Sequence, residues 1–565
     1  MAGTLMVQGT SSSAGKSLTV TGLVRLFRQE GYTVAPFKAQ NMSLNSYPAI
    51  EGGEIGRAQV AQAEAAGLPP SVHMNPVLLK PTTDVGAQVI VLGKPIGHMG
   101  AREYHEFKSS LLPVVKESLD HLRSLYDVVV IEGAGSPAEI NLRENDIVNM
   151  AVAHLADANV ILVADIDRGG VFASIYGTWA LLDDADRARL RAFIVNRFRG
   201  DASILEPGIR EIEELTGMVC LGVVPYLRDV GIDDEDSVSL DETTEAQGRQ
   251  PRDAQGWPLG EGPKVAIVRL PRISNFTDFK PLETCGLFRV RWVDRADEVE
   301  GADLIVIPGT KSTVGDLLAM RERGLEEAIR ARRDAGAHVL GVCGGYQMLG
   351  ERILDPEHVE SARTETPGLA LLPLETTFAA EKVTEPVRVR GAGAGWLASD
   401  AAVVGYEIHM GRTVGPCRPL FLVESESPSG DDGPGAALSG VAPTLDGEAG
   451  AAGAVGGPPP VIGTAAVVRG EGAVSDDGRV SGSYVHGLFD DFSVLAGLAR
   501  VLGVAEDRIE ALRPGYLAHQ EAKDQAYERL AAVFREHLDL KALHSLVFGS
   551  DESGETAART TEAGA

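Results

Sequence analysis

The chain has 565 residues, enough for two or more domains that each enclose a hydrophobic core. Its hydrophobic content of 44% and charged content of 23% are typical of globular enzymes, and a formal net charge of −28 argues against a nucleic acid or an anionic membrane as partner. No segment approaches the roughly 18 consecutive apolar residues that suggest a membrane-spanning helix, and no signal peptide precedes the first strand. We therefore expect a cytoplasmic protein with no membrane partner.

The cysteines exclude two further classes of protein. There are four, and they are widely spaced: Cys220, Cys285, Cys343 and Cys417. None forms a Cys-x-x-Cys pair, so we expect neither a zinc site nor a disulfide framework, and a reducing compartment fits better.

The first 232 residues alternate apolar runs of strand length with helical patterns. The expected strands are 4–8, 33–37, 89–93, 127–132, 160–165, 191–195 and 221–225. Nearly continuous Val, Ile and Leu runs indicate parallel strands that are buried on both faces. This pattern predicts a doubly wound α/β domain.

The first expected strand leads into a glycine- and serine-rich loop, Gly9-Thr-Ser-Ser-Ser-Ala-Gly-Lys-Ser17, and a helical pattern follows. A surface turn is the alternative, but the order strand, loop, helix favours a phosphate-binding loop, here one residue longer than the common form. Its backbone N–H groups would hold the phosphates of ATP, Lys16 would reach the terminal ones and the Ser17 hydroxyl would bind Mg²⁺. The expected nucleotide-binding residues of the loop are Gly9, Thr10, Ser13, Ala14, Gly15, Lys16 and Ser17.

Polar residues also end several later strands of this domain. Glu132 precedes Gly133-Ala-Gly135 at a strand end, where a carboxylate holds magnesium in phosphate-loop folds, so we predict a Mg²⁺ ligand. Lys38 either neutralises a phosphoryl group or is an ordinary surface lysine, and Asn196 is placed where an amide could recognise the nucleotide base. Asp165 and Asp167 either bind metal or substrate, or cap the glycines that follow them.

Residues 233–262 read as an interdomain linker, acidic at first and then rich in Gly, Pro and Gln. A second α/β series follows, and we assign residues 263–548 to one domain. Its expected strands are 264–270, 288–293, 304–308 and 339–343, then β-rich stretches at 361–380 and 403–409, strands at 462–468 and 481–489, and a helical tail at 492–548. Residues from about 424 to 460 are predicted to be a disordered insert, and residues 549–565 a flexible tail.

Cys343 lies in the second series, between an apolar run and the glycines Gly344 and Gly345. This pattern is typical of a strand–turn–helix elbow that presents a nucleophile, although a buried structural cysteine before a tight turn is the alternative. The N–H of Gly344, together with that of Gly309 in the loop Pro308-Gly-Thr-Lys-Ser-Thr313, would form an oxyanion hole.

A thiol nucleophile also needs a base. His486, in Ser483-Tyr-Val-His-Gly-Leu-Phe489, lies at an expected strand end and is the first candidate. His409, in Gly405-Tyr-Glu-Ile-His-Met-Gly411, is its competitor.

Taken together, these segments resemble the cobyric acid synthase family, the glutamine-hydrolysing amidotransferases of cobalamin biosynthesis. The resemblance covers nearly the whole chain, and the segments that carry it include VQGTSSSAGKS, APFKAQNM, EGAGSPAEINL, ADIDRGGVFAS, GVCGGYQMLG, GYEIHMGRT and YVHGLF. APFKAQNM and EGAGSPAEINL favour this family over the related cobyrinic acid a,c-diamide synthases.

The resemblance implies a dethiobiotin-synthetase-like ATP domain followed by a class I glutamine amidotransferase domain. It implies ATP-, Mg²⁺- and glutamine-dependent amidation of the b, d, e and g carboxylates of a corrinoid, adenosylcobyrinic acid a,c-diamide, to adenosylcobyric acid. Cys343 would be the nucleophile and His486 its base. The usual class I triad adds a Glu two residues after the His, where this chain has Leu488, so the group that orients His486 stays open.

Other functions remain as alternatives. The enzyme could amidate another carboxylate, on cobyrinic acid or on a cell-wall precursor, or the chain could be a phosphate-loop regulatory ATPase with a non-catalytic second domain. Cys343 together with His486 argues against the ATPase. The sequence leaves open whether the chain forms a homo-oligomer.

Overall fold

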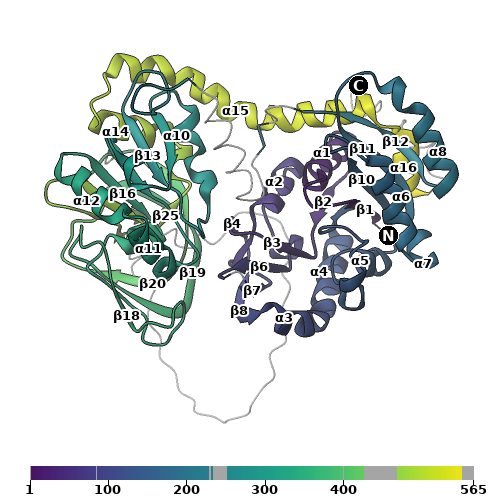
Figure 1. The fold of residues 1–565 in the computed structure, drawn as a ribbon, viewed down its shortest axis with the longest axis horizontal. Coiled ribbons are helices and arrows are strands. Elements are labelled where there is room, and N and C mark those ends of the chain that lie inside the picture. The colour runs from purple at the N-terminus through teal and green to yellow at the C-terminus, as the bar shows by residue number, and fades with distance from the viewer. Residues whose placement is uncertain are drawn as a thin grey trace, which may run out of the picture.

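The structure is a computed structural model that describes residues 2–83, 85–227, 231–232, 251–398, 400–424 and 468–549, without the side chains of residues 468 and 518–523. It has two α/β domains, which lie side by side in Figure 1. The first domain begins at the N-terminus and the second begins after residue 250. The long helix α15 (Glu506–His537) runs from one to the other.

The first domain is built on a six-stranded parallel sheet of order β12-β11-β10-β1-β9-β2. Its strands are β1 (Gly3–Gly9), β2 (Val34–Phe37), β9 (Val128–Glu132), β10 (Asn159–Asp165), β11 (Leu190–Phe198) and β12 (Val219–Pro225). The helices of the domain are α1 (Lys16–Gln29), α2 (Arg57–Ala66), α3 (Ala101–Phe107), α4 (Leu112–Leu125), α5 (Met150–Ala156), α6 (Val171–Leu181), α7 (Asp184–Arg187) and α8 (Glu206–Thr216). Separate hydrophobic clusters cover the two faces of the sheet, as near-continuous apolar strands require. The predicted doubly wound domain is confirmed.

The apolar run at 89–93 was wrongly placed in this series of parallel strands. It overlaps β7 (Gly86–Val91), which belongs to a separate four-stranded sheet with β3 (Gln40–Met42), β6 (Val77–Pro81) and β8 (Lys94–Gly100). β7 pairs antiparallel with both neighbours. A short apolar run does not reveal how its strand is paired, because antiparallel strands can be equally apolar over four or five residues. A hairpin of β4 (Ser46–Pro48) and β5 (Glu54–Gly56) precedes α2.

The second domain has a six-stranded sheet of order β14-β13-β15-β16-β24-β23, parallel except for β23. Its strands are β13 (Lys264–Val268), β14 (Arg289–Val293), β15 (Leu304–Ile307), β16 (His338–Val342), β23 (Ala473–Val474) and β24 (Val480–Ser483). Its helices are α10 (Lys280–Thr284), α11 (Thr313–Glu322), α12 (Leu325–Asp334), α13 (Gly344–Met348) and α14 (Phe492–Val501). The four strands expected between residues 264 and 343 are all present.

A second sheet of this domain contains the expected β-rich stretches. It runs β18-β17-β19-β20-β25, and β21 and β22 extend it from β19. The strands are β17 (Arg352–Leu354), β18 (Glu365–Pro367), β19 (Glu375–Gly391), β20 (Ala402–Val414), β21 (Phe421–Glu424), β22 (Val468–Glu471) and β25 (Val485–His486). β25 brings His486 to the seam between the two sheets, beside Tyr406 of β20.

Residues 251–262 pack against the second domain, so the linker predicted at 233–262 does not extend over them. Trp257 is fully buried, its indole N–H donates to the Glu300 carbonyl at 3.1 Å, and the Arg291 guanidinium lies 3.7 Å from its ring centroid. One aromatic residue therefore anchors a segment that composition alone describes as irregular. The predicted insert at 424–460 lies outside the described residues from 425 onward, as do residues 233–250 of the linker and 550–565 of the tail.

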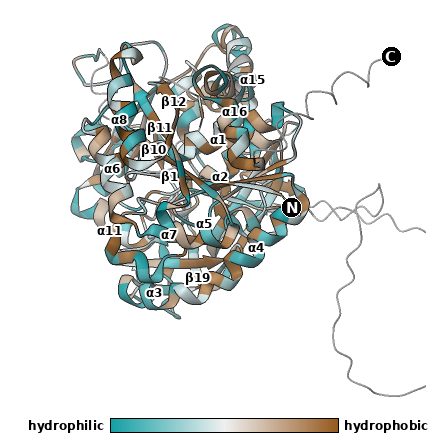
Figure 2. Ribbon diagram, turned by 90° about the vertical axis from the view of Figure 1, so that its right-hand side faces the viewer, coloured by the Kyte–Doolittle hydropathy of each residue, from teal (hydrophilic) through white to brown (hydrophobic). Residues whose placement is uncertain are grey.

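The C-terminal helices return to the first domain, although we had assigned everything up to residue 548 to the second. Tyr516, in the first half of α15, is buried in the core of the second domain. Tyr527 and Phe534, further along α15, pack with residues of α16 (Leu540–Phe548) on the core of the first domain. Figure 2 shows α15 and α16 beside α1. The first domain is thus completed by residues from both ends of the described chain.

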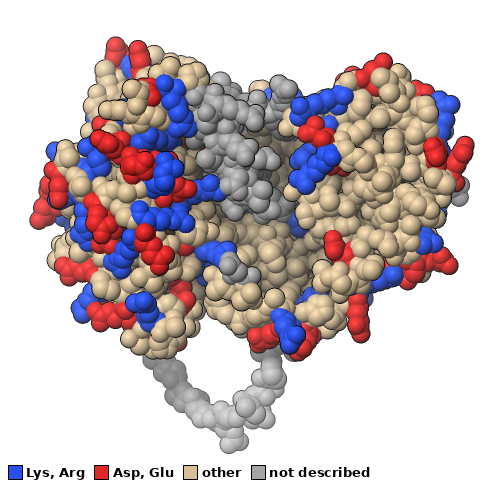
Figure 3. Space-filling view, viewed as in Figure 1, with Lys and Arg blue, Asp and Glu red and all other residues tan. Residues whose placement is uncertain are grey.

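Within the described ranges, no helix is long and apolar enough to cross a membrane. In Figure 3, acidic and basic side chains are interspersed over the second domain, on the left, and are sparser over the first domain, on the right.

Candidate functional site

The predicted phosphate loop lies between β1 and α1, at the carboxyl edge of the parallel sheet. Lys16 is 7% exposed and its Nζ donates to the carbonyls of Ser11 and Gly135, both at 3.0 Å. Gly15 has φ 101°, and a Cβ there would lie 2.1 Å from the Asn196 amide nitrogen, so only glycine fits. The Lys16 ammonium thus donates to two backbone carbonyls, which anionic oxygens of a phosphate would replace favourably.

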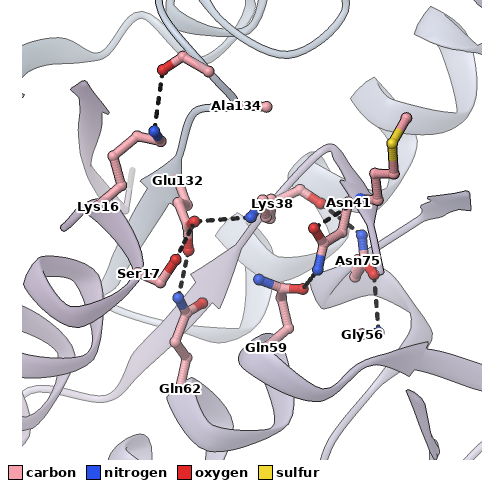
Figure 4. A network of polar contacts seen from close by, with 12 residues as sticks. Lys16, Ser17, Lys38, Asn41, Gly56, Gln59, Gln62, Asn75, Glu132 and Ala134 are labelled. Atoms are coloured by element: carbon pink, nitrogen blue, oxygen red, sulfur yellow. Dashed lines mark hydrogen bonds and ion pairs between the residues drawn. The ribbon is translucent and has the colours of Figure 1, made fainter. Parts of the chain in front are cut away.

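Glu132, at the end of β9, is the centre of a polar network beside this loop (Figure 4). Its carboxylate is 1% exposed and accepts from the Ser17 hydroxyl at 2.8 Å, the Lys38 ammonium at 2.9 Å and the Gln62 amide at 2.5 Å. The structure therefore brings three predicted residues together: Ser17, Lys38 and Glu132. Lys38 is 5% exposed, so the alternative of an ordinary surface lysine is wrong.

Asn196, at the edge of the same site, supports the loop. Its amide donates to the Ala14 carbonyl at 2.9 Å and lies against Gly15, so it braces the phosphate loop from the side of β11. Asp165 is paired with Arg197 at 3.0 Å and accepts the N–H of Asp167 at 2.8 Å. These two acids form a turn after β10.

Three neighbours of the network were missed from sequence. Gln62 and Gln59 lie three residues apart on one face of α2. The Gln62 amide donates to Glu132, and the Gln59 side-chain oxygen accepts from the Asn41 amide at 2.9 Å. Asn75 donates to the Lys38 carbonyl at 3.2 Å and so holds the segment that carries this lysine. All three amides are nearly fully buried. The sequence signals were two glutamines at i, i+3 spacing in the segment EIGRAQVAQAEAA and the asparagine of MNPVLLKP, and neither pattern shows which strand end it will contact.

Cys343 stands at the predicted elbow, between β16 and α13. It has φ 50° and ψ −110°, a conformation that residues with a side chain rarely adopt and that marks strained functional turns. A Cβ at Gly345 would lie 1.9 Å from the Ile307 carbonyl oxygen, so glycine is required for the turn to pack against β15. The Cys343 Sγ lies 3.4 Å from the Ile408 carbonyl.

The two glycines predicted for an oxyanion hole lie near the thiol. Gly344 is the first residue of α13, where the N–H has no carbonyl partner within the helix. A Cβ there would lie 3.1 Å from the Thr310 nitrogen, so the loop after β15 passes directly beside the elbow. Gly309, in that loop, approaches the ring of His486: a Cβ on it would lie 3.3 Å from His486 Cε1.

His486 forms a buried hydrogen-bonded chain with Cys343 and Asp278. The His486 Nδ1 lies 2.6 Å from Asp278 Oδ2, and the Cys343 thiol is close enough to the ring to favour its protonated form. Burial disfavours the charged imidazolium, but Asp278 and Cys343 outweigh it and raise the pKa of His486 to about 10. Asp278 is therefore the group that orients His486. It was missed because it stands 208 residues earlier in the chain.

His409, the competing base, faces elsewhere. Its Nδ1 lies 3.1 Å from the Gly411 carbonyl, its Nε2 lies 3.5 Å from Glu407, and its ring stacks on Tyr484 at 3.7 Å. These contacts occupy both ring nitrogens. Leu488, at the position of the usual class I Glu, is a buried apolar residue at 4% exposure.

All four cysteines, which lie in the described ranges, are free. No group of three or more His, Cys, Asp or Glu among the described residues could hold a metal ion on its own. A cation beside Ser17 and Glu132 would need additional oxygen ligands from a nucleotide.

Comparison with known proteins places both halves of the chain in described families. A model of the CobQ/CobB/MinD/ParA nucleotide binding domain matches residues 5–239, and one of the CobB/CobQ-like glutamine amidotransferase domain matches residues 264–441. The predicted pairing of a nucleotide-binding domain with an amidotransferase domain is confirmed.

Curated relatives match over the full length. A cobyric acid synthase from Sorangium cellulosum (strain So ce56) is 47% identical over 97% of this chain and 99% of its own. Another, from Pelotomaculum thermopropionicum, is 44% identical over 97% of each chain, and one from Alkaliphilus metalliredigens is 44% identical over 96% of this chain and all of its own. Two domain matches in the same order and full-length identity of this degree show that the chain belongs to the cobyric acid synthase family.

Proposed function

We propose that this enzyme uses ATP to activate carboxylates of a corrinoid and converts them to amides with ammonia released from glutamine. The substrate would be adenosylcobyrinic acid a,c-diamide, amidated at its b, d, e and g side chains. The observation that carries the proposal is the presence, in one chain, of a buried Cys–His–Asp cluster and of a phosphate loop whose serine hydrogen-bonds to a buried glutamate. Neither site alone would make an amide from glutamine.

The geometry around Cys343 supports the following mechanism for glutamine hydrolysis. The thiolate attacks the side-chain amide carbon of glutamine, and the N–H groups of Gly344 and Gly309 stabilise the oxyanion. His486 then donates its proton to the departing nitrogen, which leaves as ammonia. Water attacks the thioester with His486 as base, and glutamate is released. Asp278 stabilises the imidazolium in both half-reactions and keeps one ring nitrogen directed at the sulfur.

At the first domain, a substrate carboxylate attacks the terminal phosphate of ATP to give an acyl phosphate and ADP. Ammonia then displaces phosphate and leaves the amide. Lys16 and Lys38 supply positive charge where the transferring phosphoryl group gains negative charge. A carboxylate alone is a poor acyl donor, which is why nucleotide is consumed.

The residues beside the loop fit a magnesium ion. Mg²⁺ prefers hard oxygen ligands and usually takes only one or two from protein, the others coming from phosphates and water. The Ser17 hydroxyl and the Glu132 carboxylate, 2.8 Å apart, provide such a pair. The bound ion would neutralise phosphate charge, and Lys38 balances the carboxylate in its absence.

The mass of the corrinoid product tests the proposed function. The purified enzyme is incubated with the a,c-diamide, ATP, Mg²⁺ and glutamine, and the corrinoids are separated and weighed by mass spectrometry. Each amidation replaces a hydroxyl by an amino group, so four stepwise decreases in mass are expected, and a Cys343→Ala variant should show them only with added ammonium. An unchanged corrinoid mass, with amidation of cobyrinic acid or of a cell-wall precursor instead, would refute the substrate assignment.

A further inference from the structure

A hairpin of the first domain contacts the residues that support His486. In strand β4, the Ser46 N–H donates to Asn275 Oδ1 at 3.2 Å, and the Asn275 Nδ2 donates to the Ser46 carbonyl at 3.0 Å. Ser46 is 1% exposed and Asn275 is 4% exposed. The Asn275 side-chain amide of the second domain thus makes the two hydrogen bonds with the Ser46 backbone that the backbone of a neighbouring strand would make. Because the groups are buried, losing one partner would leave the other unsatisfied.

Asn275 is connected to the Asp278–His486 pair in two ways. It stands three residues before Asp278, at the start of the short 3₁₀ turn Phe276–Phe279, and has φ 52°. Its Nδ2 also donates to the Tyr406 hydroxyl at 3.0 Å. That hydroxyl lies 3.5 Å from Asp278 Oδ1, and the Tyr406 ring stacks on His486 with centroids 5.3 Å apart and planes at 17°.

The first domain also touches Tyr406 directly. The ring of Tyr47, the residue after Ser46, lies 4.6 Å from that of Tyr406. Tyr406 is therefore in contact with His486 of its own domain and with β4 of the other. Asn275 and Tyr406 both belong to the second domain and connect β4 to His486.

The β4–β5 hairpin is fixed within the first domain by buried polar contacts of Glu54, which also pairs with the second domain. Glu54 of β5 is fully buried, accepts from the Ser46 hydroxyl at 2.7 Å and from Lys80 at 2.9 Å, and forms an ion pair with Lys382 of the second domain. β5 leads into α2, whose Gln62 contacts Glu132. The Gly56 N–H at this junction donates to Asn75, as Figure 4 shows.

We propose that Asn275 is a positioning residue through which strand β4 holds Asp278 and Tyr406 against His486, so that glutamine is hydrolysed efficiently only when the two domains are docked. The inference rests on the proposed function, because it assigns the Cys343 site as a glutaminase. Its physical basis is that Asn275 begins the short turn that carries Asp278, and that its buried amide bonds both to the Tyr406 hydroxyl and to the Ser46 carbonyl. The pairing with Ser46 fixes this amide from outside the domain. Ammonia would then form mainly when the acceptor domain is in place.

The test measures two activities of each variant: glutamate formation from glutamine, and amide formation with added ammonium. Asn275→Gly removes the side-chain amide without backbone strain, because glycine accepts φ 52°. We expect a loss on the order of 10- to 100-fold in kcat for glutamine hydrolysis with a smaller change in KM, since the residue acts on His486 and not on the substrate. Ammonium-supported amide formation should stay near the parent rate.

Two further variants separate positioning from general damage. Gln88→Met is the matched control: Gln88 is another buried residue at the domain contact, where its amide lies 3.7 Å from the Met410 sulfur, and it has no link to Asp278. It should hydrolyse glutamine normally. Combining Asn275→Gly with Asp278→Asn should reduce kcat little beyond Asp278→Asn alone, because both act through one hydrogen-bonded chain.

Parent-like glutamine hydrolysis by Asn275→Gly, or additive losses in the double variant, would overturn the inference. If Asn275→Gly does not fold, Tyr406→Phe decides, because it keeps the ring over His486 and removes only the bridging hydroxyl: a lower kcat supports the inference and a parent kcat refutes it. The proposed function is checked in parallel with Cys343→Ala. If that variant still hydrolyses glutamine, the glutaminase assignment itself fails, whereas an inactive Cys343→Ala beside a fully active Asn275→Gly refutes only the role of Asn275.

Discussion

Replacing Asp278 with Asn tests the catalytic chain most directly, because it removes one charge and almost no volume. The amide can still contact His486 Nδ1, but it no longer stabilises an imidazolium. Burial, which already disfavours the charged ring, would then be opposed only by Cys343, and the pKa of His486 should fall. We expect glutamine hydrolysis to fall by ~10²–10⁴-fold in kcat, with ammonium-supported amide formation retained.

The magnitude follows from the protonation equilibrium. A pKa raised from 6.5 to about 10 corresponds to a preference for the imidazolium of about 5 kcal/mol, of which Asp278 is the largest favourable source. Losing even half of this preference in the transition state would reduce the rate by roughly 10²-fold. The effect on folding has a definite sign. A raised pKa stabilises the folded parent fully below about pH 6.5, and this contribution is lost as pH rises toward 10.

Two measurements check this reasoning. Histidine NMR titration of the parent and of Asp278→Asn should show the His486 transition moving to much lower pH in the variant. The difference between their unfolding free energies should narrow as pH is raised from about 7 to 10. A variant that keeps the parent kcat, or whose His486 still titrates near pH 10, would show that another group supports the imidazolium.

Three other substitutions give distinct outcomes. His486→Ala should lower glutamine hydrolysis by at least ~10²-fold, whereas His409→Ala should weaken it less, because both nitrogens of His409 face other groups; equal losses would contradict the choice of base. Lys16→Ala should lower amide formation by ~10²–10³-fold with either glutamine or ammonium, and activity with ammonium would argue against the phosphate loop. Phe534→Ala should destabilise the first domain by about 3–5 kcal/mol, seen as a lower Tm, because Phe534 is 2% exposed and packs against α1 at Gly22; an unchanged Tm would show that α15 is dispensable there.

The sequence predicted best what is encoded locally. The phosphate loop and the elbow at Cys343 are each contiguous, and each combines a strand, glycines and a reactive side chain whose spacing is dictated by backbone sterics. Glu132 was predictable for the same reason, since the end of a parallel strand is a fixed position relative to the loop beside it. In these cases the sequence motif by itself largely determines the local geometry.

Residues that act across the fold were not predictable in this way. Asp278 reaches His486 only because β13, β15 and β24 bring distant segments to one edge of the sheet. The return of α15 to the first domain was hidden because an amphipathic helix shows that it has an apolar face, and not which domain covers it. The prediction for the strand near residue 89 was wrong for a related reason. Its hydropathy indicates that the strand is buried, but not which strands pair with it or in which direction.

The covalent connection between the two domains explains how a small number of contacts between them can hold the β4–β5 hairpin against the second domain. The second domain is joined to the first at both of its ends, by the chain before residue 251 and by α15, whose later residues pack on α1. Docking of the hairpin at Asn275 is therefore an intramolecular event, and it does not have to overcome the several kcal/mol of translational and rotational entropy that free domains would lose. A few buried contacts, such as Ser46 with Asn275 and Glu54 with Lys382, then suffice to hold the docked arrangement.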